Sequence, residues 1–168
     1  YKYLCETVGG TFIKLSLNSA YHLNPFDLPK IGEDEDPEDV LRSNIASLIG
    51  LLHIMLGSVT PEEDSILDVA IRETYAMRDI TPQSNFKSFT PTSFPTMSDL
   101  YEVIRNSEGG ESLAKRMEKY TEGIFAGVLN HPTNVQIDNQ LVVFNIRDLE
   151  EQLRPIAMYI VLQFIWNE

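Results

Sequence analysis

The sequence contains few cysteines and few basic residues, and both shortages exclude classes of protein. Cys5 is the single cysteine among 168 residues, so no disulfide can form within the chain. Lys and Arg number 13 against 25 Asp and Glu, which leaves a formal net charge of -12. Surfaces that bind nucleic acids or anionic membranes need clustered positive charge. We therefore expect a reducing, cytoplasmic setting and no direct contact between this segment and nucleic acid.

The sequence also lacks both motifs with which P-loop ATPases bind and hydrolyse nucleotide. No G-x-x-x-x-G-K-[ST] string occurs, so there is no loop whose backbone amides and lysine could hold phosphates. The apolar run at 141–144 is followed by Asn145 and Ile146, where a magnesium-positioning strand would carry Asp and Glu. We expect no catalytic residue and no bound ATP or Mg²⁺ in this chain, and no ATPase activity from it alone.

Metal-ligand spacings are missing as well. The three histidines stand at positions 22, 53 and 131, without a second His or Cys at a ligand spacing. Acidic residues cluster between positions 31 and 39, but a calcium loop in this register would need Gly in place of Asp39 and Glu in place of Ile45. A solvent-exposed helix N-terminus explains the cluster better, because acidic side chains are favoured at the positive end of a helix dipole. We predict no metal site.

No apolar run is long enough for a membrane-spanning helix. The longest one covers residues 156–166, about half of the roughly 20 residues that such a helix needs. It predicts a buried helix, and we expect the chain to be peripheral to a membrane at most. The chain opens on Tyr1 without a signal-peptide pattern and stops at Glu168 inside a predicted helix. We expect both ends to be cut from a longer protein.

Two segments have the composition of strands. Residues 11–17 alternate apolar and polar side chains, and residues 141–146 are rich in β-favouring side chains. Residues 135–137, with a turn at 138–139, predict that the second segment is one arm of a β-hairpin. The two distant segments are expected to share one sheet, because a lone strand cannot satisfy its backbone hydrogen bonds.

Helices are predicted between and after these strands. Asp36 and Pro37 form a start signal, Gly57 is a stop signal, and Thr60 with Glu63 predicts a capping box. Apolar residues then recur at steps of three and four. The predicted helices span residues 37–57, 61–78, 98–104, 113–128 and 151–168, the last with Pro155 as a kink or as its true start. The fold class is therefore α+β, mainly α.

Three stretches stand in an order that is typical of one known family. They are Gly-Gly-Thr-Phe-Ile-Lys-Leu-Ser at 9–16, His-Leu-Asn-Pro-Phe-Asp at 22–27, and Val-Phe-Asn-Ile-Arg-Asp-Leu at 143–149 leading into Leu-Arg-Pro-Ile-Ala at 153–157. In this order they resemble the VirB/TraC-like ATPases of conjugation and type IV secretion. The resemblance covers the whole chain, although residues 31–130 share only a helical plan with that family.

The resemblance implies an internal segment of a P-loop ATPase, lying between its Walker A and Walker B motifs. Residues 1–30 and 132–168 would be parts of a RecA-like nucleotide-binding core. Residues 31–131 would form an all-helical subdomain inserted between strands of the core sheet.

The resemblance also implies properties of the parent protein. The parent would bind ATP and Mg²⁺ and energise conjugative DNA transfer or type IV secretion. Its partners would be other type IV secretion components and further copies of itself, as a hexamer or a dimer. It would be cytoplasmic, or held at the inner face of the cell membrane through those partners.

Four residues are candidates for a nucleotide pocket or a subunit interface. Asn24 and Asp27 lie in a turn directly after a sheet strand, where the resemblance implies a nucleotide edge or a subunit boundary. A structural Asx-Pro turn that redirects the chain is the alternative. Arg147 and Arg154 are the arginines closest to the predicted sheet, so either could reach phosphates of a neighbouring subunit. Pairing with acids nearby in the sequence is the alternative for both.

A second functional hypothesis is a non-enzymatic, acidic helical module that binds a basic partner protein. The missing catalytic motifs and the negative charge favour it. The two hypotheses are compatible, because the helical insertion of an ATPase is itself a surface for coupling and subunit contacts.

Overall fold

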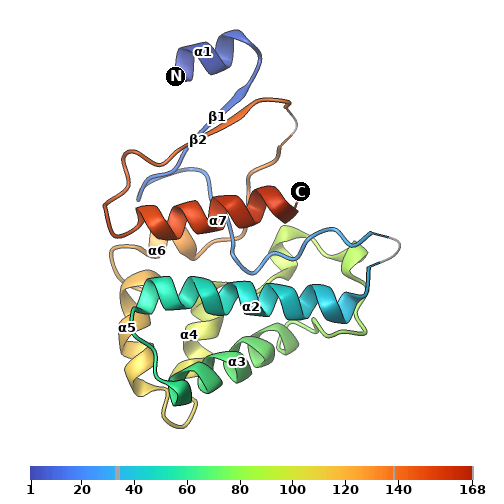
Figure 1. Ribbon diagram of the computed structural model, residues 1–168, viewed down its shortest axis with the longest axis vertical. Helices are drawn as coiled ribbons and strands as arrows, with labels where there is room; N and C mark the ends of the chain where they lie inside the picture. Colours follow the sequence, from blue (N-terminus) through green and yellow to red (C-terminus); the bar gives the residue numbers. More distant parts are fainter. Residues whose placement is uncertain (33–34, 138, 168) are drawn as a thin grey trace.

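The computed structural model describes residues 1–32, 35–137 and 139–167, which form a mainly helical fold (Figure 1). Residues 33–34, in the acidic cluster, and 138, in the expected hairpin turn, lie outside the described residues. In chain order the elements are α1 (Lys2–Thr7), β1 (Thr11–Lys14), α2 (Pro37–Leu56), α3 (Pro61–Ala76), the 3-10 turns η1 (Phe86–Ser88) and η2 (Pro91–Ser93), α4 (Met97–Arg105), α5 (Glu111–Thr121), α6 (Ala126–Leu129), β2 (Val142–Asn145) and α7 (Arg154–Asn167).

β1 and β2 form a parallel two-stranded sheet. Thr11 pairs with Val142 and Lys14 with Asn145, and Leu15 N–H donates to Asn145 O at 2.9 Å. The prediction that two strands from opposite ends of the chain share one sheet is confirmed.

The expected β-hairpin is wrong. Residues 135–137 contain no strand, and β2 pairs with β1 instead. The residues just before this segment bind the loop that follows β1: Asn134 N–H donates to His22 O at 3.2 Å, and Thr133 Oγ1 accepts from Asn24 N–H at 2.7 Å. The segment therefore runs along that loop, and β2 is left to pair with β1.

Gly10 lets three segments meet at the start of β1. An added Cβ at this position would lie 2.8 Å from Cys5 Sγ and 2.9 Å from Leu141 O, both too close for a real contact. Thr11 N–H donates to the same Leu141 O at 2.9 Å, so the close approach belongs to the strand pairing. A residue without a side chain is therefore needed where α1 reaches the sheet.

α2 and α3 begin and end where the sequence signals predict. Asp36 Oδ1 accepts from Glu38 N–H at 2.9 Å at the start of α2, and Gly57, with a φ of 75°, ends the helix. Thr60 and Glu63 form the capping box of α3, with bonds of 3.0 and 3.2 Å. The predicted spans are confirmed to within two residues, and local signals set both ends of α2 and the start of α3.

α2 is the central helix of the helical part. By length and composition alone it could span a membrane, a test that the core helix of a globular protein also passes. Its apolar stripe contacts α3, α5 and α7, and Leu48 in the middle of that stripe has no exposed surface. The composition of α2 is thus explained by burial inside this chain.

The helix predicted over residues 113–128 is divided into α5 and α6. α5 ends at Thr121, and Gly123 N–H turns back to donate to Glu118 O at 2.8 Å. An added Cβ at Gly123 would lie 2.6 Å from Lys119 Cα, so the tight turn excludes a side chain. The apolar spacing does not reveal the break, because side chains on both sides of the turn face the same core.

α7 lies between the strand pair and the helical part (Figure 1). It starts at Arg154, so Pro155 stands in its first turn, where the missing N–H costs no helical bond. The prediction of a buried helix is correct for one face only. The other side exposes Met158, Leu162, Ile165 and Trp166.

Candidate functional site

The turn at residues 24–27, Asn-Pro-Phe-Asp, is held by hydrogen bonds that Asn24 makes within the turn and to two distant parts of the chain. Asn24 is buried, its Oδ1 accepts from Phe26 N–H at 3.1 Å, and its own N–H donates to Thr133 Oγ1 at 2.7 Å. Its Nδ2 donates to Pro95 O at 2.8 Å. The side-chain oxygen and nitrogen of Asn24 are thus both engaged within the chain, in the geometry of a structural Asx turn.

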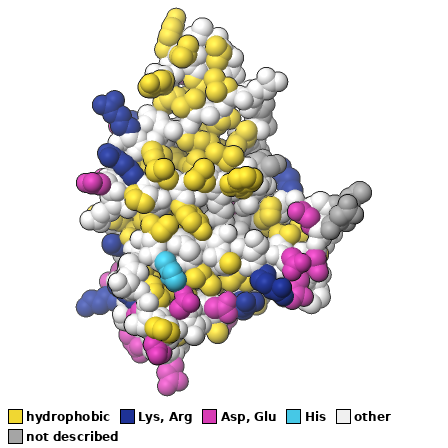
Figure 2. Space-filling model, viewed as in Figure 1, with side chains coloured by type: hydrophobic (Ala, Val, Ile, Leu, Met, Phe, Trp, Pro, Cys, Tyr) yellow, Lys and Arg dark blue, Asp and Glu magenta, His cyan; other side chains and the backbone are white. Residues whose placement is uncertain are grey.

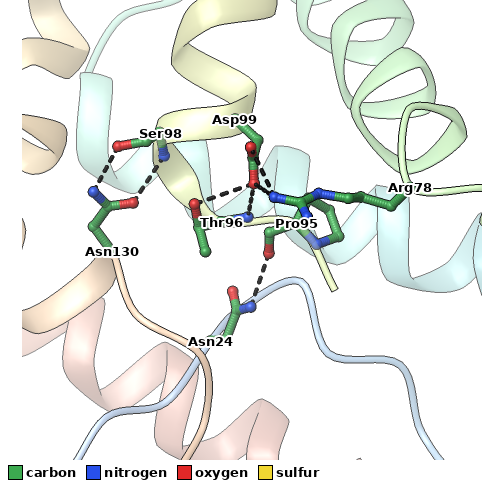
Figure 3. A network of polar contacts seen from close by, with 7 residues as sticks. All are labelled: Asn24, Arg78, Pro95, Thr96, Ser98, Asp99 and Asn130. Atoms are coloured by element: carbon green, nitrogen blue, oxygen red, sulfur yellow. Dashed lines mark hydrogen bonds and ion pairs between the residues drawn. The ribbon is translucent and has the colours of Figure 1, made fainter. Parts of the chain in front are cut away.

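The bond to Pro95 connects the turn to the start of α4 (Figure 3). Thr96 N–H donates to Asp99 Oδ2 at 2.7 Å, so Thr96 caps the helix in place of Ser98 and α4 starts at Met97, one residue before the predicted span. Arg78 Nη2 donates to both oxygens of the same carboxylate, at 3.1 and 3.0 Å. Asn24 therefore reaches a helix start that is already held in place by an ion pair.

A second set of buried contacts joins the turn to α2 and α7. Tyr75 Oη donates to Phe26 O at 2.8 Å and accepts from Asn44 Nδ2 at 2.7 Å. Gln163 Nε2, on α7, donates to Asn44 Oδ1 at 2.9 Å. Burial raises the pKa of the Tyr75 hydroxyl far above its ordinary value, so it stays protonated and can donate. One chain of hydrogen bonds thus connects the turn with α3, α2 and α7.

A cavity of about 420 Å³ lies beside the turn. It is bounded by Asp27, by three phenylalanines of the segment between α3 and α4, and by the second half of α7. Phe89 lies 5.9 Å from Phe86 and 5.9 Å from Phe94, measured between ring centroids. Phe86 and Phe94 are buried, as expected for a Pro-rich segment that aromatic side chains hold against the helices. The turn therefore borders a space large enough for a small ligand.

Arg147 lies in the connection between β2 and α7, and Arg154 is the first residue of α7. Arg154 Nε donates to Leu149 O at 3.0 Å and its Nη2 donates to Arg147 O at 3.2 Å, so its guanidinium binds carbonyl oxygens rather than acids. Arg147 is exposed and directly follows the strand segment. The nearby acid Asp148 pairs with Lys14 at 2.5 Å, and this bond lowers the pKa of Asp148. Arg154 thus stabilises the backbone between β2 and α7.

The four candidate residues do not meet in one site. Asn24 and Asp27 lie near the end of α7, where Asn167 Nδ2 is 3.5 Å from Asp27 O, whereas Arg154 is the first residue of this helix. Its 14 residues, at a rise of about 1.5 Å each, separate the two ends by roughly 20 Å. Arg147 lies at the carboxyl edge of the parallel strands, where α/β sheets bind their ligands. The turn and the two arginines therefore belong to two separate sites.

Sequence reasoning missed the residues after α6 that bind the start of α4 and the segment just before the turn. Asn130 Oδ1 accepts from Ser98 N–H at 2.9 Å (Figure 3), and Asn134 Oδ1 accepts from His22 N–H at 2.7 Å. The rings of His22 and His131 lie 4.3 Å apart, centroid to centroid. Burial, and then the charge of His131, lower the pKa of His22. The run of polar residues after α6 could have pointed to these contacts, but from the sequence alone it indicates only the end of a helix.

Metal ligands do not converge within residues 1–32, 35–137 and 139–167. No three His, Cys, Asp or Glu side chains of these residues are grouped so that they could hold an ion. His53 Nε2 lies 2.7 Å from Asp64 Oδ1 on the surface, a pairing of two groups only.

The fold as a whole has a solved relative. Comparison of the sequence with known protein families and with curated proteins finds no match. Comparison with solved structures finds VirB4 of Thermoanaerobacter pseudethanolicus, with a TM-score of 0.87 and 25% sequence identity over 99% of this chain. The chain spans 65% of the length of that solved chain. By its fold, which extends over both strands and the helices between them, this chain is a VirB4-like segment, as the order of its sequence stretches predicts.

Proposed function

We propose that this chain is an internal segment of an ATPase that energises conjugative DNA transfer or type IV secretion. The observation that carries the proposal is the similarity to VirB4, with a TM-score of 0.87 over 99% of the chain. Because the chain spans only 65% of that relative, the rest of a longer protein would supply the missing parts. These are the phosphate-binding loop and the magnesium-positioning acids, on either side of the segment.

In this proposal, residues 1–30 and 132–168 contribute to a RecA-like nucleotide-binding core. Parallel strands occur almost only inside larger sheets that helices cover on both faces, and a two-stranded sheet is marginal by itself. Among the described residues, β1 and β2 have only each other as partners. Further strands of the longer protein would complete the sheet, and residues 31–131 would be the helical subdomain inserted into it.

Arg147 is the proposed contact to nucleotide, in its own or a neighbouring subunit. It is exposed at the carboxyl edge of the strand pair, and trans-acting arginines stabilise the charge that develops on transferred phosphates. Arg154 would act through the backbone that carries Arg147, since it donates to Arg147 O. Arg147 would thus reach the phosphates, and Arg154 would hold Arg147 in position.

Asn24 and Asp27 are proposed to couple the core to the helical part and to subunit contacts. The turn that contains them binds Pro95 at the start of α4, and through Tyr75 it reaches α2 and α7. A shift of the core after hydrolysis would displace this turn and, with it, the helices. Coupling of this kind needs a rigid connection, which buried and paired polar groups provide.

The groups that hold ATP and Mg²⁺ would lie in the parent protein outside this segment, and Arg147 would only reach phosphates that those groups have already bound. We infer a parent that is cytoplasmic, reaches the inner face of the cell membrane through other secretion components, and self-associates as a hexamer or a dimer. The net charge of -12 makes direct contact between this segment and nucleic acid unfavourable.

Two measurements test the proposal. Isothermal titration of the 168-residue chain with Mg-ATP should give no binding, whereas a longer protein that contains the chain should hydrolyse ATP. In the longer protein, Arg147→Ala should lower kcat by about tenfold or more, and Arg105→Ala, on the surface of α4, should change it by less than about twofold. A micromolar dissociation constant for the chain alone would overturn its placement between the two motifs. A kcat that Arg147→Ala leaves unchanged would remove Arg147 from the nucleotide site.

A further inference from the structure

A groove of about 720 Å³ runs between the first half of α2 and the second half of α7. The helices touch where Gly50 faces Tyr159, since an added Cβ at Gly50 would lie 2.8 Å from Tyr159 Oη. Toward the start of α2, Val40 lines one side of the groove, and Leu162 and Trp166 line the other. This hollow is called the α2–α7 groove below.

The α7 side of the groove is apolar and exposed. Leu162 has 55% of its surface exposed and Trp166 has 86%. Figure 2 shows hydrophobic side chains gathered over α7 and the strands, with acidic side chains mainly lower on the same face and at its right side. Large apolar side chains that stand together on one wall of a groove mark a contact surface, because burying them is favourable.

The α2 side of the groove is negatively charged. Glu35, Asp36 and Asp39 line it, and none of its described lining residues is Lys or Arg. Arg42 pairs with Glu38 at 2.7 Å and with Asp39 at 3.3 Å, so it compensates only part of this charge. An acidic rim therefore faces an apolar wall.

One residue that lines the groove carries a buried hydrogen-bond acceptor. Gln163 lines the groove, and its Nε2 donates to Asn44 Oδ1, but its buried Oε1 has no partner among the described residues. A buried carbonyl oxygen without a hydrogen bond is unfavourable. Gln163 lines both this groove and the cavity beside the turn, so a small movement of its side chain would let the oxygen accept from an N–H donor in either space.

We propose that the α2–α7 groove binds a basic, amphipathic segment of a partner protein. Apolar side chains of that segment pack on Leu162 and Trp166, while its Lys and Arg side chains face Asp36 and Asp39. Such a segment fits the groove as an amphipathic helix laid between two helices. The charge of -12 attracts a basic partner and disfavours nucleic acids and anionic lipid. This binding surface goes beyond the ATPase role and does not depend on it.

The fluorescence of Trp166 reports on the groove directly, because it is the single tryptophan of the chain. The probe is a synthetic peptide of about four helical turns, with Leu on one face and Lys on the other. Titration of the 168-residue chain with this peptide should shift the emission to shorter wavelength and reach saturation. A matched peptide with Glu in place of every Lys should produce no shift. Added salt should weaken the binding of the Lys peptide, because it screens the attraction between opposite charges.

Variants of the chain distinguish binding of the peptide in the groove from its non-specific attraction to the acidic surface. Leu162→Ser should weaken binding by about tenfold or more, and Asp39→Asn by about two- to fivefold. The matched controls are Met158→Ser, exposed on α7 outside the groove, and Glu73→Gln, exposed on α3. Each control should change the dissociation constant by less than about twofold.

Several outcomes would overturn the proposal. The groove is the wrong surface if Leu162→Ser and Asp39→Asn bind the Lys peptide as tightly as the unchanged chain does. Equal binding of the Glu peptide, or no binding of the Lys peptide, excludes a basic occupant. Dimerisation of the chain in sedimentation experiments that Leu162→Ser abolishes would identify a second copy as the occupant instead.

Discussion

At the scale of single residues, buried polar side chains gather around the turn at residues 24–27. Asn24, Asn44 and Thr133 are buried, and each takes part in the hydrogen bonds that hold the turn or its link to α2. A buried polar group that loses its partner costs about 1–3 kcal/mol. These residues therefore specify one position of the turn, because any other position would leave several of them unpaired.

Asn24→Ala should lower the free energy of unfolding by about 1–3 kcal/mol. The change leaves the Pro95 carbonyl and the Phe26 N–H without their partners. Asn106→Ala is the matched control, because Asn106 is exposed and its Nδ2 donates only to the carbonyl of Glu102. It should cost less than about 0.5 kcal/mol in the same urea titration. Equal losses for the two variants would mean that the turn is not held by Asn24.

The stability of the chain should fall as the pH drops below about 6.5, the ordinary pKa of histidine. In the folded chain, burial and then His131 lower the pKa of His22. Between the lowered and the ordinary pKa, the unfolded chain binds the proton more readily, so acid favours unfolding. Above the ordinary pKa both states are neutral and the effect is absent.

Urea titrations at about pH 7.5 and 5.5, where exposed carboxylates stay mostly ionised, measure this effect. The unfolding free energy should be smaller at the lower pH, and His131→Asn should reduce the difference because it removes the second ring. A difference of the same size in the variant would show that His131 does not act on His22.

At the scale of elements, α2 has more buried residues than any other described helix. It contacts α3, α5 and α7, and its two ends are capped by Asp36 and Gly57. Start signal, stop signal and apolar spacing all agree over its length, which is typical of an element whose local sequence and tertiary environment are consistent.

Leu48→Ala should destabilise the chain by about 2–5 kcal/mol, since Leu48 is fully buried in the middle of α2. Ile54→Ala on the same helix is the control, because Ile54 is 44% exposed and its removal leaves a smaller cavity. Reversible urea unfolding measures both variants. A loss below about 0.5 kcal/mol for Leu48→Ala would contradict the packing of α2 described here.

At the scale of the whole molecule, the helical part and the strand pair differ in how well they are covered. Helices α2 to α5 pack on one another, whereas α1 buries only Cys5 and each described strand has a single partner. α7 lies between these two parts (Figure 1). Elements with less burial have a lower free energy of local opening, so the strand pair and α1 should open more easily than the helical part.

Amide hydrogen exchange followed by mass spectrometry should therefore be fastest in α1, β1 and β2 among the regular elements. Amides in the middle of α2 should exchange slowest, at a rate close to that set by global unfolding. Peptides from the two regions of the same sample serve as each other's control. Strand amides that exchange as slowly as those of α2 would indicate that the sheet is stable without further strands.

The elements that the sequence predicts correctly are those with local signals. The caps at Asp36, Gly57 and Thr60 lie within a few residues of the groups they bind, so both ends of α2 and the start of α3 can be found without knowing the fold. The missing phosphate-binding loop is also a local fact, because the motif is one continuous string.

The candidate site could be predicted only in part. The turn at residues 24–27 stands out by its Asn and Pro, but its partners Pro95 and Thr133 have no recognisable spacing from it. Arg147 and Arg154 could be found as basic residues near a strand, yet their separation from the turn depends on the length and placement of α7.

What the sequence by itself determined is the set of helices with caps, the two strands that need a partner, and the absence of the nucleotide motifs. Only the tertiary structure decided that β2 pairs with β1 and not with residues 135–137, because Asn134 binds His22. It also decided that the turn at residues 24–27 is bound by Pro95 and Thr133, which lie far from it in the sequence. Both outcomes depend on groups that meet only after the chain has folded, whereas caps, turns and strand composition act through neighbours along the backbone.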